Sequence, residues 1–449
     1  MMSQRVHRLL FGIIEVEEAH MRQDQPTIAF YTLGCKVNQY DTTVLETAFV
    51  TAGYRKVDAG ETADVYLVNS CSVTGRSEAK ARQTVRRFRR LHPETIIALV
   101  GCYVEANPQS ASQLGQADIL LGTGVPERVV AAVDQALGRS EQASPFSVPL
   151  ESLARASGRT RAQLKIQDGC DAYCTYCIVP LARGPIKSRP PEEVLAHARA
   201  LRRAGYQEIV ISGVRLGTYG RDLGDTSLAT LLPRLDELGN YRLRLSSIEP
   251  EDVSPELIAA LAHSRNFCPH LHLPVQSGSD GVLRRMGRRY HAGEYRGLVG
   301  ELRNALGELA VSTDIIVGFP GETDEDFEDT YRLIEEIGFS RLHVFRYSSR
   351  PGTAAAGFKE QVPSRVKKER SARMMDLGAE LSLAYHRHYQ GKTVQVLVEE
   401  RGEDGMLQGF TRDYVRVRFE GRDELSNSLV CIQVEEVDAQ GLVGQGVEV

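Results

Sequence analysis

The stretch QLKIQDGCDAYCTYC, residues 163–177, determines how the rest of the chain is interpreted. Its first half favours a strand, and its second half carries Cys170, Cys174 and Cys177 in the pattern Cys-x-x-x-Cys-x-x-Cys. A zinc site needs a fourth ligand, and no further Cys or His stands close by in the sequence. Three thiolates can instead hold a four-iron cluster and leave one iron with an open coordination position. The motif therefore favours a reactive iron–sulfur centre over a structural zinc site.

Outward from this motif, residues 161–350 alternate between strand-like and helix-like segments six times. The strands expected are QLKIQDG, EIVISG, RLRLSS, HLHLPV, STDIIVG and RLHVFRYS. Each is followed by a turn signal and a helical pattern, which predicts a partial (β/α)6 barrel with its site at the carboxyl ends of the strands. One long helix is expected to follow, at residues 363–390.

Residues 26–137 show the same alternation and predict an α/β, Rossmann-like parallel-sheet domain. Three strands there run directly into loops that carry Cys35, Cys71 and Cys102. Because the carboxyl ends of parallel strands share one edge of a sheet, these cysteines are expected to converge in space. The alternative is that they are small buried apolar residues, as free cysteines often are.

The remaining segments complete a domain plan. Short alternating strands with Gly turns at residues 389–449 predict a small antiparallel β-barrel. The full plan is an atypical extension at 1–25, a first cluster domain at 26–137, a linker at 138–160, a partial barrel with its trailing helix at 161–388, and the small barrel at 389–449. Met21 is an alternative start.

Composition limits the classes of function. The 449 residues include 54 basic and 59 acidic side chains, a net charge of −5, so any nucleic-acid surface must be a local patch. No run of about 20 apolar residues and no signal-peptide cleavage region is present, and a cytoplasmic location without a membrane partner is expected. Of the eight cysteines, Cys268 and Cys431 lack a motif and are interpreted as structural.

The motifs together resemble a known family. The Cys-x-x-x-Cys-x-x-Cys pattern with Tyr176 before its last cysteine is similar to the radical S-adenosylmethionine superfamily. The N-terminal cysteines, with TLGCKVNQYD, NSCSVT, RLSSIEP, HLPVQSGSD, MGRRY and DIIVGFPGET, resemble its methylthiotransferases over about residues 26–449. The sequences of these motifs most resemble those of the MtaB type, and the small C-terminal barrel resembles the RNA-binding TRAM domain of these enzymes.

This resemblance implies an activity. The MtaB type adds a methylthio group to carbon 2 of N6-threonylcarbamoyladenosine at position 37 of tRNA, beside the anticodon. It implies two 4Fe–4S clusters, on Cys170, Cys174 and Cys177 as catalytic ligands and on Cys35, Cys71 and Cys102. It also implies two S-adenosylmethionine molecules per turnover, a sulfur donor, and an electron donor such as flavodoxin or ferredoxin. The alternatives are a methylthiotransferase for isopentenyladenosine in tRNA or for a ribosomal-protein aspartate, and a non-catalytic iron–sulfur RNA-binding protein.

Further residues are expected near S-adenosylmethionine or the nucleoside, because they stand at or just past strand ends of the barrel. These are Tyr176, Ser212, Gly213, Glu249, Gln276 and Gly318, with Gly321 beside the last. For each, an ordinary role at a strand end is the alternative. His270 and His272 share a strand face, but two imidazoles are too few for a metal, and a polar barrel lining is the expectation.

Two segments are candidates for RNA contact. The helix RSEAKARQTVRRFRR has seven basic residues, among them Arg82, Arg86 and Arg89, several of them three or four positions apart. In the small barrel, Arg412, Tyr414 and Arg416 are expected on one face of a strand, suited to stacking and phosphate contact. A solvated helix face is the alternative for the first segment.

Overall fold

The computed structural model describes residues 25–139, 148–156 and 158–447. Most of the expected N-terminal extension, with Met21, lies outside these residues. The described chain forms two compact units that divide after Ala156. Among the described residues, every helix is too short or too polar to cross a bilayer.

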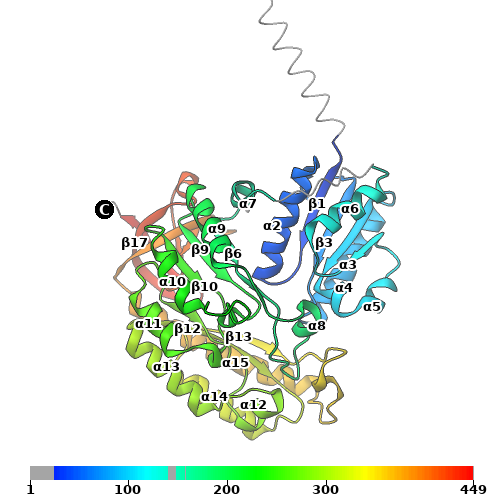
Figure 1. The fold of residues 1–449 in the computed structure, drawn as a ribbon. Helices are drawn as coiled ribbons and strands as arrows, with labels where there is room; N and C mark the ends of the chain where they lie inside the picture. The colour runs from blue at the N-terminus through cyan, green and yellow to red at the C-terminus, as the bar shows by residue number, and fades with distance from the viewer. Residues whose placement is uncertain (1–24, 140–147, 157, 448–449) are drawn as a thin grey trace, which may run out of the picture. The chain divides into compact units, whose positions relative to one another are not determined.

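The N-terminal unit is a five-stranded parallel sheet with helices on both faces (Figure 1). Its strand order is β2-β1-β3-β4-β5, and the strands are β1 Thr27–Thr32, β2 Arg55–Val57, β3 Val65–Ser70, β4 Ile96–Gly101 and β5 Ile119–Leu121. The central strand β3 is buried along its whole length, as a parallel strand covered on both faces must be. The expected Rossmann-like domain is confirmed, and the two short edge strands, β2 and β5, were not anticipated.

Helices cover this sheet in two layers, each with its own apolar core. Side chains of α2 and α6 pack on one face, and those of α3 and α4 pack on the other. The helices are α2 Lys36–Thr51, α3 Gly75–Leu91, α4 Cys102–Ala106, α5 Pro108–Ser112, α6 Pro126–Ala136 and α7 Leu150–Ala156. Helix α7 lies within the range expected to be a linker and packs against α2, so the end of that range is structured and belongs to this unit.

The C-terminal unit begins with six parallel strands arranged as two three-stranded sheets, in the orders β10-β9-β6 and β11-β12-β13. A parallel bridge between Leu243 and Phe267 connects the segments beside β10 and β11. The strands are β6 Arg161–Lys165, β9 Glu208–Ser212, β10 Arg242–Leu245, β11 His270–His272, β12 Ala310–Val317 and β13 Arg341–Arg346. All six match the strands expected from the sequence, which confirms the partial barrel.

Helices alternate with these strands. They are α8 Val179–Arg183, α9 Pro191–Arg203, α10 Leu228–Asp236, α11 Pro255–His263, α12 Asp280–Met286, α13 Ala292–Leu306, α14 Asp324–Ile337 and the trailing α15 Ser364–His386. Two antiparallel strands of two residues each, β7 Gln167–Asp168 and β8 Lys187–Ser188, pair at the two ends of the segment that contains the cysteine loop. Short 3-10 turns lie at Leu216–Thr218, Pro250–Asp252, Ala354–Gly357, Arg387–Tyr389 and Asp423–Leu425.

The chain ends in a closed five-stranded barrel of order β14-β15-β16-β18-β17. Its strands are β14 Thr393–Arg401, β15 Leu407–Phe410, β16 Arg416–Phe419, β17 Leu429–Asp438 and β18 Gly441–Val447. The barrel is confirmed, but the pair β16–β18 is parallel whereas the other pairs are antiparallel.

A buried ion pair connects this barrel to the parallel strands. Arg244 on β10 is fully buried, and its Nε donates to Glu208 on β9 at 2.6 Å. Its Nη2 donates to the carbonyl of Thr411, in the turn between β15 and β16. The turn of the small barrel is therefore held against the sheet by a hydrogen bond from Arg244 to the backbone carbonyl of Thr411.

Candidate active site

The loop with the first cysteine triad begins at Gly169, directly after β7. Gly169 has φ +74°, and a Cβ there would lie 1.8 Å from the carbonyl oxygen of Pro185, so only glycine fits. The next residue, Cys170, donates its N–H to the carbonyl of Gly184 at 3.0 Å. The cysteine motif thus starts at a fixed point on the neighbouring chain segment.

The second half of the loop is clamped to helix α12. Thr175 donates its N–H to Met286 O at 2.9 Å and its hydroxyl to Arg285 O at 2.8 Å. The N–H of Cys177 donates to Cys174 O at 2.9 Å, which closes the turn between these two cysteines. Both ends of the motif are held by backbone hydrogen bonds, as a preorganised ligand set requires.

The three thiols lie close enough together to influence one another electrostatically. Burial raises the pKa of Cys170 and Cys174, and it raises the pKa of Cys177 to about 12. A bound cation such as iron would offset this effect of burial, because it favours the thiolate. Cys268 lies beside Arg244, and Cys431 lies on β17 of the small barrel. Neither is therefore a candidate for a fourth ligand. The residues therefore fit a cluster with three protein ligands.

Tyr176 belongs to a hydrogen-bonded chain that the sequence did not reveal. The Arg288 Nη2 donates to its hydroxyl at 3.0 Å, and the Arg288 Nη1 contacts Glu249 Oε2 at 2.6 Å. Arg288 is buried, and its positive charge partly offsets the rise that burial causes in the pKa of Cys174. Tyr176 and Glu249 were both expected at the site. Arg288 was missed because it stands in MGRRY beside a second arginine, with no spacing to distinguish it.

Other expected residues, and Ser246, which was not expected, lie at or just past the carboxyl ends of the strands. The hydroxyls of Ser212 and Ser246, at the ends of β9 and β10, are buried without a hydrogen-bond partner among the described residues. Gly213 packs against Gln167, whose Oε1 would lie 2.8 Å from a Cβ on it. Gln276 is buried with φ +66°, unusual for a residue with a side chain. Unpartnered buried hydroxyls in this position fit a polar ligand such as the methionine part of S-adenosylmethionine.

Gly318 and Gly321 have reasons within the chain for their lack of a side chain. A Cβ on Gly318 would lie 2.3 Å from Lys367 Cγ, and a Cβ on Gly321 would lie 2.7 Å from Glu360 Oε2. The N–H of Gly318 donates to Glu322 at 2.9 Å. These contacts account for glycine at both positions, and the expected approach to a nucleoside stays a prediction.

The second triad gathers at the carboxyl edge of the N-terminal sheet. Cys35 directly precedes α2, Cys71 follows β3, and Cys102 is the first residue of α4. Cys71 and Cys102 are buried whereas Cys35 is exposed. Two of the three, Cys35 and Cys102, therefore stand at helix N-termini.

Asn38 shows that these three cysteines converge. Its Oδ1 lies 3.4 Å from the Sγ of Cys35 and 4.0 Å from the Sγ of Cys102. A Cβ on Gly34 would lie 2.8 Å from Cys71 Cβ and 3.2 Å from the Asn38 side chain. Residues from three strand ends thus surround one amide, and this arrangement fits a second cluster.

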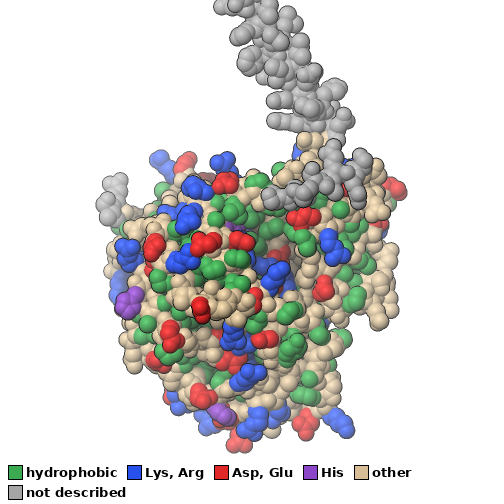
Figure 2. Space-filling view, viewed as in Figure 1, with side chains coloured by type: hydrophobic (Ala, Val, Ile, Leu, Met, Phe, Trp, Pro, Cys, Tyr) green, Lys and Arg blue, Asp and Glu red, His purple; other side chains and the backbone are tan. Residues whose placement is uncertain are grey.

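The basic helix α3 differs from the expected RNA face. Arg89 donates to Pro93 O at 2.6 Å and contacts Asp118 at 2.5 Å, and Arg82 faces Glu78 at 3.8 Å. Arg86 is exposed as expected. The other exposed basic residues of the helix are Arg76, Lys80, Arg87 and Arg90, spaced as one helical stripe. Elsewhere, Figure 2 shows Lys and Arg interspersed with Asp and Glu on the viewed face.

The prediction of a strand through Arg412, Tyr414 and Arg416 is wrong. Residues 411–415 form the turn between β15 and β16, and Tyr414 has φ +72°. Phe410 stacks on its ring at 4.8 Å, and the Arg244 guanidinium lies 4.6 Å from the ring centroid. Tyr414 is thus already packed against an aromatic ring and a cation of its own chain.

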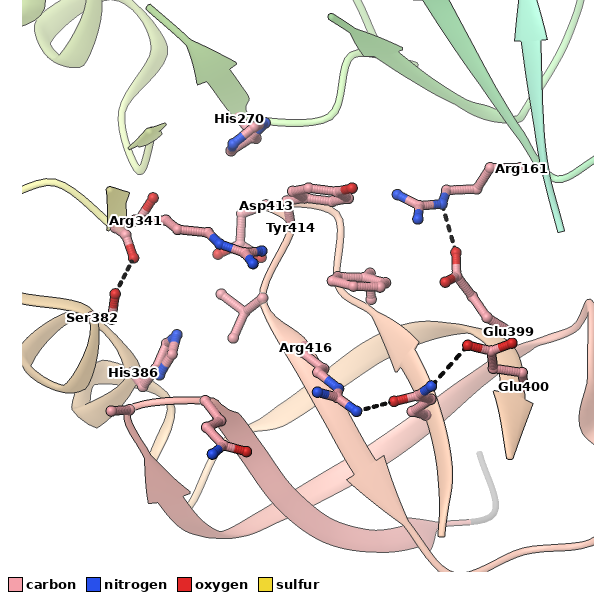
Figure 3. A pocket seen from close by; sticks show the side chains of 16 residues that line it. Arg161, His270, Arg341, Ser382, His386, Glu399, Glu400, Asp413, Tyr414 and Arg416 are labelled. Atoms are coloured by element: carbon pink, nitrogen blue, oxygen red, sulfur yellow. Dashed lines mark hydrogen bonds and ion pairs between the residues drawn. The ribbon is translucent and has the colours of Figure 1, made fainter. Parts of the chain in front are cut away.

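The two arginines beside Tyr414 are also engaged within the chain. Arg412 donates to the carbonyl of Phe267 at 2.8 Å, and Arg416 donates to Gln408 Oε1. Arg416 and Tyr414 line a cavity of about 600 Å³, which His270 and Arg341 also line (Figure 3). This segment therefore joins the two parts of the unit.

Comparison with known proteins follows the same division of the chain. Residues 164–334 match the radical SAM superfamily, and residues 27–122 match the uncharacterized protein family UPF0004. The chain is 40% identical to the threonylcarbamoyladenosine tRNA methylthiotransferase MtaB of Bacillus subtilis, over 91% of this chain and 93% of that protein. It is 36% identical to the tRNA-2-methylthio-N(6)-dimethylallyladenosine synthase of Geobacillus kaustophilus, over 92% and 81% respectively.

A solved structure shares the fold. The radical S-adenosylmethionine methyltransferase TsrM from Kitasatospora setae, determined with cobalamin and a 4Fe–4S cluster bound, superposes with a TM-score of 0.54 at 15% identity. The match covers 74% of this chain and 77% of TsrM.

Proposed function

We propose that this chain, which belongs to the methylthiotransferase family of radical S-adenosylmethionine enzymes, adds a methylthio group to carbon 2 of N6-threonylcarbamoyladenosine at position 37 of tRNA. The observation that carries the proposal is the pair of cysteine triads, each gathered at the carboxyl ends of parallel strands. The choice of nucleoside rests on relatives of the MtaB type, which are 34–40% identical over about nine-tenths of the chain.

The proposed cofactors are two 4Fe–4S clusters and S-adenosylmethionine. Cys170, Cys174 and Cys177 would hold one cluster, and the N-terminal triad would hold the other. When bound at the first triad, the cluster and S-adenosylmethionine supply a carbon-centred radical, which can remove hydrogen from an unactivated C–H bond as no side chain can.

The chain's own residues orient this chemistry. The loop from Gly169 to Cys177 is fixed at both ends, so Cys170, Cys174 and Cys177 would hold the cluster on a preorganised loop. Arg288 holds Tyr176 and Glu249 in place beside the loop. The hydroxyls of Ser212 and Ser246 offer hydrogen bonds to a polar ligand at the strand ends.

The proposed macromolecular substrate is the anticodon loop of tRNA. The exposed stripe on α3 is suited to neutralise phosphates, and a loop nucleotide is already accessible, so extruding it costs less than from a duplex. The reaction further needs an electron donor, such as flavodoxin or ferredoxin, and a sulfur donor. A cytoplasmic location, where tRNA is modified, is part of the same proposal.

The first experiment compares the native chain with a variant in which Cys35, Cys71 and Cys102 are all changed to Ala. After anaerobic reconstitution, iron should fall from about eight to about four per chain, with reductive cleavage of S-adenosylmethionine retained. Mass spectrometry of tRNA incubated with the native enzyme should then show methylthiolated threonylcarbamoyladenosine.

The outcomes separate the alternatives. If the native chain holds only about four irons and the variant loses none, the methylthiotransferase proposal fails. Methylthiolated isopentenyladenosine in place of the expected product would assign the chain to the other tRNA substrate. Modification of a ribosomal-protein aspartate would assign the chain to a protein substrate. If reduction of the enzyme with S-adenosylmethionine gave no 5′-deoxyadenosine, the product of reductive cleavage, a non-catalytic protein would be favoured.

A further inference from the structure

Three side chains that could bind a metal lie together on the second three-stranded sheet of the barrel. They are His272 on β11, Asp314 on β12 and His343 on β13. Asp314 is the register partner of His343, and His272 pairs with Ser312, two residues before Asp314. Since residues two apart share a strand face, all three project from the same face of the sheet. His272 was expected only as part of a polar lining, because its partners are distant in sequence.

Two of the three spacings between the ligand atoms are those of a coordination sphere. Asp314 Oδ1 lies 3.1 Å from His272 Nε2 and 3.3 Å from His343 Nδ1, and all three atoms lie within 4.8 Å of one another. Ligands bonded to one ion at about 2.05 Å are roughly 3.3 Å apart at a tetrahedral angle and roughly 2.9 Å apart at a right angle. Both observed contacts fall within that interval.

A second layer of contacts orients the His272 ring for this role. Its Nδ1 lies 2.9 Å from the hydroxyl of Ser312, which is also 2.9 Å from His270 Nε2. If Nδ1–H donates to Ser312, the Ser312 hydroxyl can donate onward to His270, and both contacts are satisfied. The lone pair of His272 Nε2 then points at the Asp314 carboxylate. A cation between these two atoms removes their repulsion, and metal-bound histidines commonly have such a partner on the other nitrogen.

We propose that His272, Asp314 and His343 bind a divalent first-row cation, Zn²⁺ or Fe²⁺, at a site that includes none of the cysteines of the two triads. Two imidazoles and one carboxylate suit these borderline metals and leave coordination positions open to water or a further ligand. The site is accessible, because 42% of the His343 side chain and 26% of the Asp314 side chain are exposed. The ion would connect β11, β12 and β13, next to Gln276, whose N–H donates to the carbonyl of Asp314.

Zinc binding by the reconstituted holoenzyme tests this site. The protein is equilibrated with Zn²⁺ and a weak competing chelator, and zinc and iron are counted by mass spectrometry. We expect about one zinc per chain in addition to the cluster iron, and loss of that zinc in Asp314→Ala and in His343→Ala. The matched control is His291→Ala, which breaks an exposed His–Asp contact of 3.4 Å that no third ligand joins among the described residues. It should keep the zinc.

The iron count shows that each variant is folded and holds its clusters. The proposal is overturned if the native holoenzyme binds no zinc. It is also overturned if Asp314→Ala and His343→Ala with full iron still bind zinc, since thiols would then be the ligands. If Asp314→Ala and His343→Ala both also lose iron, the zinc affinity of Ser312→Ala decides between the two outcomes. A zinc affinity weakened by about 10- to 100-fold supports the site, and an unchanged affinity overturns it.

Discussion

Replacing Asn38 by aspartate should remove the N-terminal cluster while leaving the other in place. The change keeps the size and shape of the side chain, so packing is preserved. In the native chain Asn38 Nδ2 donates to Leu33 O at 3.1 Å and to Ser70 O at 2.9 Å. An aspartate has no donor for these two buried carbonyls. It also brings a carboxylate to the place where Cys35 and Cys102 converge.

The magnitude follows from these contacts. Each buried acceptor that loses its donor costs about 1–3 kcal/mol, so the two together destabilise the unit by roughly 2–6 kcal/mol. A carboxylate about 4 Å from a thiolate adds about 4 kcal/mol of repulsion at an effective dielectric constant near 20. Thiolate ligands and an ionised Asp at position 38 therefore repel each other strongly, and this repulsion weakens cluster binding.

The assay is iron and sulfide content after anaerobic reconstitution, together with the free energy of unfolding. Asn38→Asp should hold about four irons instead of about eight. Thr42→Val is the matched control, because the Thr42 hydroxyl donates to Asn38 O at 3.0 Å and accepts from Asn69 at 3.0 Å without contacting a thiol. It should lower stability and keep all the iron. Full iron in Asn38→Asp, or equal iron loss in Thr42→Val, would refute the role given to Asn38.

Three further predictions concern other residues. Arg87→Ala and Arg90→Ala should weaken tRNA binding and reduce the slope of log K against log salt by about 0.7–0.9 for each phosphate that is no longer neutralised, whereas Arg89→Ala should mainly lower the unfolding free energy. Arg288→Met should slow cleavage of S-adenosylmethionine by about 100-fold with iron content unchanged, because two site residues lose their common donor, and Arg288→Lys should not restore it. Burial lowers the pKa of His197 to about 3, below its unfolded value near 6.5, so its contribution to stability is present above pH 6.5 and is lost as the pH falls toward 3. Urea titrations at pH 7 and 5.5 should differ by roughly 1 kcal/mol more for the native chain than for His197→Gln.

Patterns that depend on local sequence were predicted well. The six barrel strands, the buried strand β3 and the three cysteines after strands follow from short apolar runs ending in turns. The edge strands β2 and β5 were missed because three residues are too few for a pattern. Residues 411–415 were misassigned because alternation of side-chain types continues through the turn, while the left-handed backbone at Tyr414 leaves no signal in the sequence.

Contacts between distant segments could not be predicted in the same way. His272, Asp314 and His343 come from three strands separated by tens of residues, and only the strand register brings them together. Arg288 is similar, because its partners Tyr176 and Glu249 belong to other parts of the barrel. In each case the residue type is ordinary for its position, and the contacts arise only when segments distant in sequence pack together.

The same difference separates the two cysteine triads. Cys170, Cys174 and Cys177 lie within eight consecutive residues, and backbone hydrogen bonds at both ends of the loop fix them locally. Cys35, Cys71 and Cys102 come together only when β1, β3 and β4 are paired in register, with Asn38 bonded to the chain between them. Binding of a cluster to the second triad is therefore coupled to folding of the whole N-terminal sheet. Mild denaturation that disrupts this sheet should release the iron of that triad as the strands separate, and loss of the iron should in turn destabilise the sheet.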